Sequence, residues 1–466
     1  MNDLKKDLVF FVDLVRAFLE EEKKQPITKA ISPKEVGHKI DVKLNEHATN
    51  EEEFQIILKK LILNSPKSAT KLFYNQLYGG RQSKALIGDF LSALLNNSMA
   101  TYKIAGPQVN IEKEVLDSII SITNFGKKAS GTFPTGGSMS NFMSLIMARD
   151  KFNPGSITKG VEKKLIVYTS VNSHYSVSKN VSFSGVGRDN IRYVGANNKG
   201  QIDVKLLKSQ IKKDIKNGLK PFYLNATAGT TVLCAFDPIE KLIPICKKYD
   251  IWLHVDGAFG GTAIFSKKYS KLLKGVGQAD SFCFNAHKTL GAPISTSVLI
   301  VKNKEHLNRS FNNEASYLYQ THDNDYNLGQ TSFECGRRNN ALKFWCLWKS
   351  VGKKGIEKIV DKNFYLADFA RKYIKSNKNY KLYSFEKTLS VCFNYKNFDP
   401  VDLCTKLYEK NKLMVGFGKF KETTFVRLVT INSENTEGDI INFFKVLEKF
   451  TLENPELVKK ISSNEE

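Results

Sequence analysis

Short apolar segments alternate with helical segments between residues 70 and 345, and this alternation limits the possible folds more than any other feature of the chain. The helical segments include 204–215 and 238–249. Strands that alternate with helices form a mostly parallel sheet that has helices on both faces. We therefore predict an α/β fold whose ligands bind at the carboxyl ends of the strands. The predicted strands are 164–170, 191–195, 221–227, 251–256, 281–286 and 295–301.

The regions on either side of this alternation have different patterns. In "DLVFFVDLVRAFLEE" (7–21) the apolar residues recur at helical spacing, which predicts a helix near the N-terminus. Near the C-terminus, "LSVCFNY" (389–395) and "TFVRLVTIN" (424–432) predict strands among further helices. The predicted division is an N-terminal helical arm (1–70), a large domain (71–345) and a small C-terminal α+β domain (346–466).

The charge of the chain does not by itself indicate a partner. The formal net charge is +23, but the lysines are scattered, as in 208–220, and are not gathered with aromatic residues into a nucleic-acid motif. No apolar run approaches the ~20 residues of a membrane span. The short apolar run at 8–12 has an acidic flank, which does not fit a signal peptide. We therefore predict neither a nucleic-acid nor a membrane partner.

The cysteines also narrow the class of protein. No two of them form a CxxC pair, and most stand in apolar surroundings, so we predict neither a zinc site nor a disulfide framework. Reduced cysteines of this kind are typical of a cytoplasmic protein. They are Cys234, Cys246, Cys283, Cys335, Cys346, Cys392 and Cys404.

Two features suggest a ligand at the first part of the sheet. In "TFPTGGSMSNFM" (132–143), Gly136, Gly137 and Ser138 come just before an apolar helical pattern. A glycine turn at a helix N-terminus exposes backbone N–H groups, which suits a phosphate group. His174 lies in the segment 171–180, which comes immediately after the predicted strand 164–170. Taken alone, the turn also fits an ordinary loop, and the histidine also fits a structural role.

Two more features lie at the ends of later strands. Asp256 ends the strand 251–256 behind apolar Trp252 and Leu253, and a buried carboxylate is costly without a cationic partner. The alternative is a carboxylate that caps a turn. Lys288 follows the strand 281–286, where partial desolvation should lower its pKa. A lysine that is neutral part of the time can attack an aldehyde; the alternative is a surface lysine at a helix start.

Together the four features are the parts that hold pyridoxal 5′-phosphate. The lysine carries the aldehyde, and the glycine turn takes the phosphate. The acid pairs with the pyridine nitrogen and keeps it protonated, so that the ring accepts electrons. The histidine covers one face of the ring.

The motifs that contain these residues resemble the group II pyridoxal-phosphate-dependent decarboxylases. The resemblance covers roughly residues 70 to 450. The shared motifs are "FPTGGSMSN", "SHYSVSKN", "NATAGTTVLCAFDPI", "WLHVDGAFGG", "ADSFCFNAHK" and "ECGRR". The resemblance implies an aspartate-aminotransferase-like fold (fold type I). It is nearest to the glutamate, cysteine sulfinate and aspartate branch in "FYNQLYGG", "PFYLNATAGTTV", "SYLYQ" and "FVRLVTIN".

The resemblance implies roles around the cofactor. Lys288 would bind the aldehyde, and Asp256 would pair with the pyridine nitrogen. Ala258 would pack on the ring face opposite His174, and Thr231 would lie near the ring. The phosphate would be contacted by Gly137, Ser138, Asn285 and His287.

The resemblance also implies roles around an amino acid substrate. Arg427 would hold the α-carboxylate, and Gln76 would point at the distal group. Tyr317, on the polar segment 311–327, would protonate the substrate carbon after CO₂ leaves. In the glutamate branch this segment reaches the partner subunit's site, so the resemblance implies a homodimer.

Several residues depart from the family pattern, and we expect them to bear on the substrate and not on the cofactor. They are Lys103, Gly106, Gly257, Phe259, Ala286 and Ser295. The predicted function is decarboxylation of a small acidic amino acid: glutamate, aspartate or cysteine sulfinate.

Three alternatives remain beside this prediction. The substrate could be basic, such as diaminobutyrate. The reaction could be an oxidative deamination to an aldehyde that depends on decarboxylation, although that branch tends to lose the loop tyrosine or the stacking histidine, and both Tyr317 and His174 are present. A non-catalytic binding protein of the same fold would be expected to lose Lys288 or Asp256, and both are present.

Overall fold

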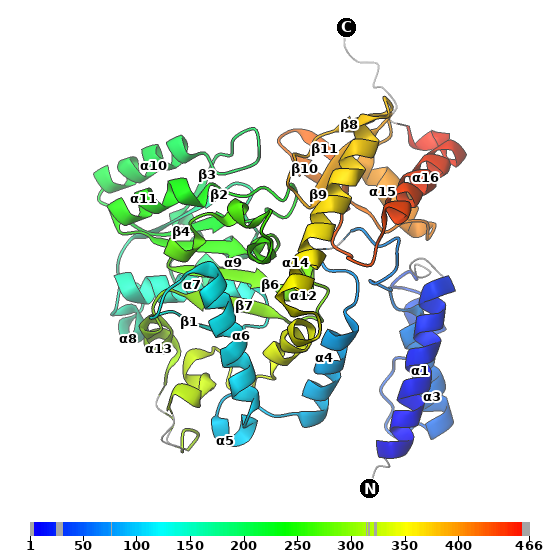
Figure 1. Cartoon of the computed structure of the whole chain (residues 1–466), viewed down its shortest axis with the longest axis horizontal. Coiled ribbons are helices and arrows are strands. Elements are labelled where there is room, and N and C mark those ends of the chain that lie inside the picture. Colours follow the sequence, from blue (N-terminus) through cyan, green and yellow to red (C-terminus); the bar gives the residue numbers. More distant parts are fainter. Residues whose placement is uncertain are drawn as a thin grey trace. The chain divides into compact units, whose positions relative to one another are not determined.

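The chain folds into two compact units in a computed structural model that describes residues 4–24, 31–75, 77–313, 315, 317–320 and 324–458 (Figure 1). The first unit consists of Met1–Gly80, Phe369–Tyr383 and Val391–Glu466, and the second of Arg81–Asp368 and Ser384–Ser390. The three-part division predicted from the sequence stays a prediction. Among the described residues, no helix combines the length and the apolar content that a bilayer crossing requires.

The second unit is built on a seven-stranded sheet of order β1-β7-β6-β5-β4-β2-β3. Strands β3, β2, β4, β5 and β6 run parallel, whereas β7 is antiparallel to both of its neighbours. The predicted α/β fold with a mostly parallel sheet and all six predicted strands are confirmed; β1, only three residues long, gave no recognisable pattern. The strands are β1 (Ser130–Thr132), β2 (Leu165–Ser170), β3 (Ile191–Val194), β4 (Lys220–Thr227), β5 (Trp252–Gly257), β6 (Ser281–Asn285) and β7 (Ser297–Val301).

Helices cover both faces of this sheet. Helices α10 and α11 pack on one face, and α7 and α9 lie on the other (Figure 1). All six residues of β2 and of β5 are consequently buried, as expected for parallel strands covered on both sides. The helices of this unit are α4 (Ser83–Leu95), α5 (Tyr102–Ala105), α6 (Gln108–Thr123), α7 (Gly137–Phe152), α8 (Ser156–Lys159), α9 (Ser176–Phe183), α10 (Val204–Lys216), α11 (Ile239–Tyr249), α12 (Ala286–Thr289) and α13 (Glu305–Phe311).

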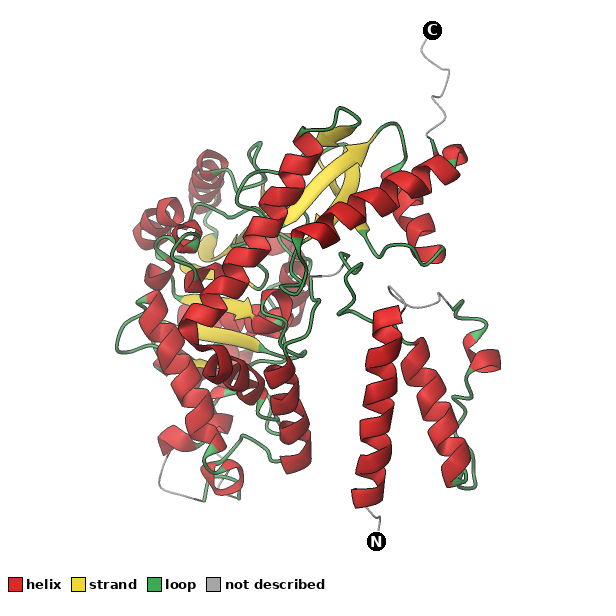
Figure 2. Cartoon of the chain, turned by 45° about the vertical axis from the view of Figure 1, so that its right-hand side comes forward, coloured by secondary structure: helices red, strands yellow, loops and turns green. Residues whose placement is uncertain are grey.

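The first unit contains the N-terminal helices and a small sheet. Helix α1 (Leu4–Lys24) packs against α3 (Glu51–Asn64), and Figure 2 shows the two side by side. The small sheet has the order β10-β11-β9-β8 and is antiparallel. Helix α1 confirms the predicted N-terminal helical segment, and the small sheet with its helices confirms the predicted smaller α+β part. Its other elements are α2 (Val36–Lys39), β8 (Tyr380–Leu382), β9 (Ser390–Tyr395), α15 (Pro400–Glu409), β10 (Gly416–Phe420), β11 (Thr423–Val429) and α16 (Glu437–Glu453). Helix α14 (Asn340–Lys375), with a break at Gly352, contributes residues to both units.

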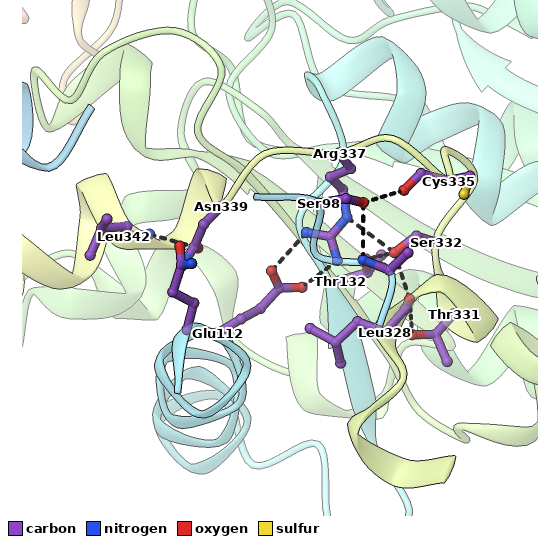
Figure 3. A network of polar contacts seen from close by, with 12 residues as sticks. Ser98, Glu112, Thr132, Leu328, Thr331, Ser332, Cys335, Arg337, Asn339 and Leu342 are labelled. Atoms are coloured by element: carbon purple, nitrogen blue, oxygen red, sulfur yellow. Dashed lines mark hydrogen bonds and ion pairs between the residues drawn. The ribbon is translucent and has the colours of Figure 1, made fainter. Parts of the chain in front are cut away.

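A buried ion pair holds the "ECGRR" segment of the second unit in place (Figure 3). The Arg337 guanidinium binds both carboxylate oxygens of Glu112 on α6, at 2.7 and 2.9 Å, and the two side chains are 3% and 1% exposed. Its Nε donates to Ser332 Oγ at 3.1 Å, and Ser332 in turn donates to the Leu328 carbonyl at 2.8 Å. The "ECGRR" motif therefore has a structural role, because Arg337 and Ser332 attach the segment 328–337 to helix α6.

Removal of one partner should show how much this pair stabilises the unit. In Glu112→Leu the buried guanidinium loses its counter-charge, so the free energy of unfolding should fall by about 3–5 kcal/mol. The matched control is Glu240→Leu, which breaks the exposed Lys274–Glu240 pair and should barely move the midpoint, because water screens that pair. Urea denaturation followed by fluorescence measures both. Equal midpoints for the two variants would contradict the expectation.

Candidate active site

Three predicted residues lie at the carboxyl edge of the large sheet. Asp256 is near the end of β5, and Lys288 lies on α12 directly after the adjacent parallel strand β6. His174 follows β2. The charges of Asp256 and of Lys288 both influence the pKa of His174, in opposite directions, so all three groups are within electrostatic reach of one another. The fold therefore brings together residues that are far apart in the chain.

The Asp256 carboxylate is buried, at 4% exposed, and both of its oxygens are hydrogen-bonded. Oδ2 accepts from Asn141 Nδ2 at 2.8 Å, and Oδ1 accepts from the Ala258 backbone N–H at 3.1 Å. Donors of this kind favour the ionised form of a carboxylate. Asp256 is therefore set up to receive a further positive donor, such as a protonated ring nitrogen.

Lys288 has the electrostatics of a nucleophilic amine. Burial lowers the pKa of its ammonium group, and the negative charge of Asp256 opposes this effect only in part. A lowered pKa increases the neutral fraction of the amine, which is the form that attacks an aldehyde. The predicted desolvation of Lys288 is confirmed.

The imidazole of His174 is held by Ser176. Burial lowers the pKa of His174; Asp256 raises it, and Lys288 lowers it further. Nδ1 accepts from the Ser176 backbone N–H at 3.2 Å and lies 2.9 Å from the Ser176 hydroxyl oxygen. The neutral ring therefore carries its proton on Nε2.

The glycine turn lies against the ends of β5 and β6. A Cβ atom added to Gly137 would come within 2.9 Å of Ala258 Cβ and 3.1 Å of Asn285 Nδ2, so only glycine fits there without a shift. Ser138 is exposed in the first turn of α7, and its carbonyl accepts from Asn180 Nδ2 at 2.9 Å. The N-terminus of a 16-residue helix thus stands beside the acid and the strand end that precedes the lysine.

Asn285 and His287 flank the same place. Asn285 Oδ1 accepts from the Ser297 hydroxyl at 2.7 Å. His287 Nδ1 accepts from the Thr296 backbone N–H at 3.0 Å, which leaves the proton on Nε2. Burial, with help from the charge of Lys288, lowers the pKa of His287 to about 4, so this ring is a neutral donor at physiological pH.

These residues fit pyridoxal 5′-phosphate. The buried carboxylate suits the pyridine nitrogen, the lysine suits the aldehyde, and the glycine turn with the His287 donor suits a phosphate group. Thr231, on the half-buried turn after β4, lies at the same edge of the sheet.

Three other predicted site residues belong to other parts of the chain. Tyr317 lies on a turn and is 82% exposed. Arg427 is on β11 of the first unit, where its Nη2 donates to the Asn75 carbonyl at 3.0 Å, and burial lowers its pKa. Gln76 lies outside the described residues.

Asn141 and Ser297 are the site residues that sequence reasoning missed. Asn141 stands within the quoted motif "FPTGGSMSN", five residues after Gly136, but a motif does not say what an amide contacts. Ser297 contacts both Asn285 and the Ser140 hydroxyl, the latter at 2.9 Å. The signal for both was a polar residue in an otherwise buried helix or strand.

Comparisons with known proteins show the family of this chain. Residues 33–396 match the model of the family described as "Pyridoxal-dependent decarboxylase conserved domain". The acidic amino acid decarboxylase GADL1 of Bos taurus is 33% identical over 406 residues, which cover 84% of this chain and 78% of that protein. The human cysteine sulfinic acid decarboxylase is 31% identical over 450 residues, which cover 91% of each chain.

A solved structure gives the same result for the fold. The crystal structure of mouse CSAD in the apo form superposes with a TM-score of 0.91 at 28% sequence identity and covers 96% of this chain and 99% of that one. The chain therefore belongs to the pyridoxal-dependent decarboxylase family and is a pyridoxal-phosphate-dependent amino acid decarboxylase, related to the acidic amino acid decarboxylases.

Proposed function

We propose that this enzyme decarboxylates a small acidic L-amino acid, namely glutamate, aspartate or cysteine sulfinate, and releases CO₂ and the corresponding amine. The observation that carries the chemistry is the Lys288 amine, with its lowered pKa, at the same sheet edge as Asp256 and His174. The printed names of the relatives, an acidic amino acid decarboxylase and a cysteine sulfinic acid decarboxylase, support the acidic class of substrate.

The proposed roles at the cofactor follow from the contacts described above. Bound pyridoxal phosphate supplies an electron-poor ring that accepts the electrons of the breaking bond. Asp256 holds the proton on the ring nitrogen, and Lys288 binds the aldehyde. His174 covers one ring face, Ala258 packs on the other, and Thr231 lies near the ring. Gly137, Ser138, Asn285 and His287 hold the phosphate.

The proposed roles at the substrate belong to other parts of the chain. The Arg427 guanidinium stays charged despite its lowered pKa, since arginine is not deprotonated in proteins, and it binds the α-carboxylate. Gln76 contacts the distal group. A carboxylate held in one orientation keeps the breaking bond aligned with the ring, and this alignment supplies much of the rate.

Tyr317 is proposed to act in the site of a partner subunit. Its side chain is exposed within its own subunit, and Gln320, three residues later, accepts a hydrogen bond from Lys103 Nζ at 3.0 Å. There Tyr317 protonates the substrate carbon after CO₂ leaves. Lys103, a departure from the family pattern, places a positive charge beside this segment and so supports an acidic substrate.

A homodimer is part of the proposal. Large apolar side chains are exposed along one stripe of α4, at the helical spacing i, i+3, i+4, i+7, i+8, and such a stripe is typical of a protein interface. They are Ile87, Phe90, Leu91, Leu94 and Leu95. A cytoplasmic location is also proposed, because none of the seven cysteines is in a disulfide bond in the part of the chain that the structure describes, and five of them are buried.

Two other departures lie close to the lysine. Ala286, where the family usually has proline, donates its backbone N–H to the Thr296 carbonyl at 2.9 Å, a bond that proline cannot make. Ser295 is next to Ile294, whose carbonyl accepts from Lys343 Nζ at 3.1 Å. Lys343 also pairs with Asp89 at 3.0 Å. These contacts fix the segment after Lys288, which we propose to influence the choice of substrate.

The role of Lys288 is tested by its removal. The purified wild-type enzyme should absorb near ~420 nm, as expected for lysine-bound cofactor. Lys288→Ala should lose this band and the decarboxylase activity, because the aldehyde then has no amine to bind. Lys274→Ala, at an exposed lysine, is the control and should keep both. A Lys288→Ala protein that kept the band would refute the assignment.

The phosphate site is tested by a pair of glycines. In Gly137→Ala the added methyl group meets Ala258 and Asn285, so the affinity for pyridoxal phosphate should fall, by about tenfold or more if one contact to the phosphate is lost. A Cβ at Gly136 would meet nothing within 4 Å, and its backbone is extended, so Gly136→Ala should leave the melting temperature of the apo protein unchanged. Cofactor titration and apo-protein melting measure the two effects. Wild-type affinity in Gly137→Ala would contradict the placement.

The substrate class is tested by measuring CO₂ release from glutamate, aspartate, cysteine sulfinate, diaminobutyrate, ornithine and tyrosine. We expect at least one of the three acidic amino acids to exceed every other substrate in kcat/KM by about tenfold or more, since a site built for a carboxylate rejects analogues that leave its donors unpaired. A preference for diaminobutyrate, ornithine or tyrosine would overturn the acidic assignment while leaving the decarboxylase chemistry intact.

A further inference from the structure

A cluster of buried polar side chains lies behind Asp256, in the part of the sheet where apolar residues would be the usual choice. Each member is at most 3% exposed. Buried polar groups are costly unless they are hydrogen-bonded, so their pairing can be followed atom by atom. The members come from α7, β4, β5 and β6; they are Asn141, Ser144, Tyr223, Trp252, His254 and Ser281.

The amide of Asn141 has only one orientation that satisfies its neighbours. The Asp256 carboxylate accepts hydrogen bonds, so Nδ2 is the atom that faces Asp256 Oδ2, at 2.8 Å. The amide oxygen then faces His254 Nε2 at 3.0 Å. His254 must therefore donate from Nε2. The opposite orientation of the amide would place an oxygen against the carboxylate.

The directions of the next bonds follow from this one. Burial lowers the pKa of His254 to about 4, so the ring is neutral, and its Nδ1 accepts from the Ser281 hydroxyl at 2.8 Å. Ser281 has then used its only proton. Its oxygen accepts from Trp252 Nε1 at 2.9 Å, and it must also accept from Ser144, whose Oγ lies 2.7 Å away.

The relay ends at Tyr223. Since Ser144 donates to Ser281, Ser144 accepts from the Tyr223 hydroxyl, at 3.3 Å. Every bond from Tyr223 through Ser144, Ser281, His254 and Asn141 thus donates toward Asp256. Bonds aligned head to tail polarise one another, and here they stabilise a negative charge on the carboxylate.

A second branch leads from the same amide to His174. Asn141 Nδ2 also lies 3.2 Å from Ser176 Oγ. The Ser176 hydroxyl can then donate to His174 Nδ1 at 2.9 Å, on the ring nitrogen that already accepts from the Ser176 backbone. The two hydrogens of one amide group therefore serve the two residues proposed to contact the pyridine ring.

We infer that Asn141 is a positioning residue, which fixes Asp256 and His174 together through a one-directional hydrogen-bond relay and leaves both His254 and His174 protonated on Nε2 alone. The inference rests on the proposed roles of Asp256 and His174 at the cofactor. In chemical terms, Asn141 holds the Asp256 carboxylate so that it faces the proposed place of the ring nitrogen, and it holds the His174 ring at a set angle.

The first test uses the wild-type apo protein and needs no cofactor. The chain has seven histidines, so ¹⁵N-histidine NMR of the apo protein can resolve them, with assignment by single replacements. His254 and His174 should each show a bare Nδ1 and a protonated Nε2. A proton on Nδ1 of either ring would overturn the relay as described.

The second test separates positioning from general stability. Asn141→Asp keeps the size of the side chain but removes both amide donors, so the ring signals of His254 and of His174 should both shift, and the dissociation constant of pyridoxal phosphate should rise by about 10- to 100-fold. Ser176→Ala interrupts only the second branch, so it should shift His174 and leave His254 in place. Asn153→Asp, at a buried amide that caps the end of the same helix, is the control and should leave both rings unchanged.

The outcomes distinguish this inference from the proposed function. If Asn141→Asp and Ser176→Ala both left the signal of His174 and the cofactor affinity unchanged, the positioning role would be wrong. If Lys288→Ala kept the absorbance band, the proposed role of Lys288 would fail, yet the ring protonation states in the apo protein would still test the relay.

Discussion

The buried charge of Asp256 is the constraint on which the rest of the site depends. A carboxylate with 4% exposure cannot rely on water, so its charge is held by the Asn141 amide, the Ala258 backbone N–H and the relay behind them. Lys288 is affected by the same charge, which keeps its pKa from falling further. The residues of the site therefore provide a negative acceptor and a partly neutral amine, and the cofactor would supply the matching positive ring nitrogen and aldehyde.

Close packing at the strand ends explains why the residues around Asp256 are small. Gly137 approaches Ala258 and Asn285 so closely that a methyl group would need a shift of its neighbours. This approach sets the N-terminus of α7 beside the acid, and α7 also carries Asn141, one turn further along. One helix thus contributes the glycine turn and the amide that contacts Asp256, so the proposed phosphate site and the proposed ring-nitrogen site are linked through α7.

The fold and the cofactor residues could be predicted from the sequence because their signals are local. Each strand is a short apolar run; Asp256 lies near the end of one, and Lys288 and His174 lie within four residues after the end of another. The relay could not be predicted, because it depends on register: His254 pairs with Ser281 across two neighbouring strands, and from helix α7 Asn141 contacts His254 while Ser144 contacts Ser281. The alternative for Lys288 was a surface lysine at a helix start. It does not fit the burial that lowers the pKa of Lys288, and a local sequence pattern does not report such burial.

The residues proposed to act in the reaction come from both compact units, and those that depart from the family pattern are separate from the relay. Asp256, His174 and Lys288 belong to the second unit, together with the relay, whereas Arg427 belongs to the first. Residues that depart from the family pattern, such as Lys103 and Ser295, take no part in the relay. Lys103 contacts Gln320, and Ser295 is next to Ile294, whose carbonyl binds Lys343. Substitutions there would leave the hydrogen bonds of Asp256 in place, so we expect substrate range and cofactor binding to be separable in this chain.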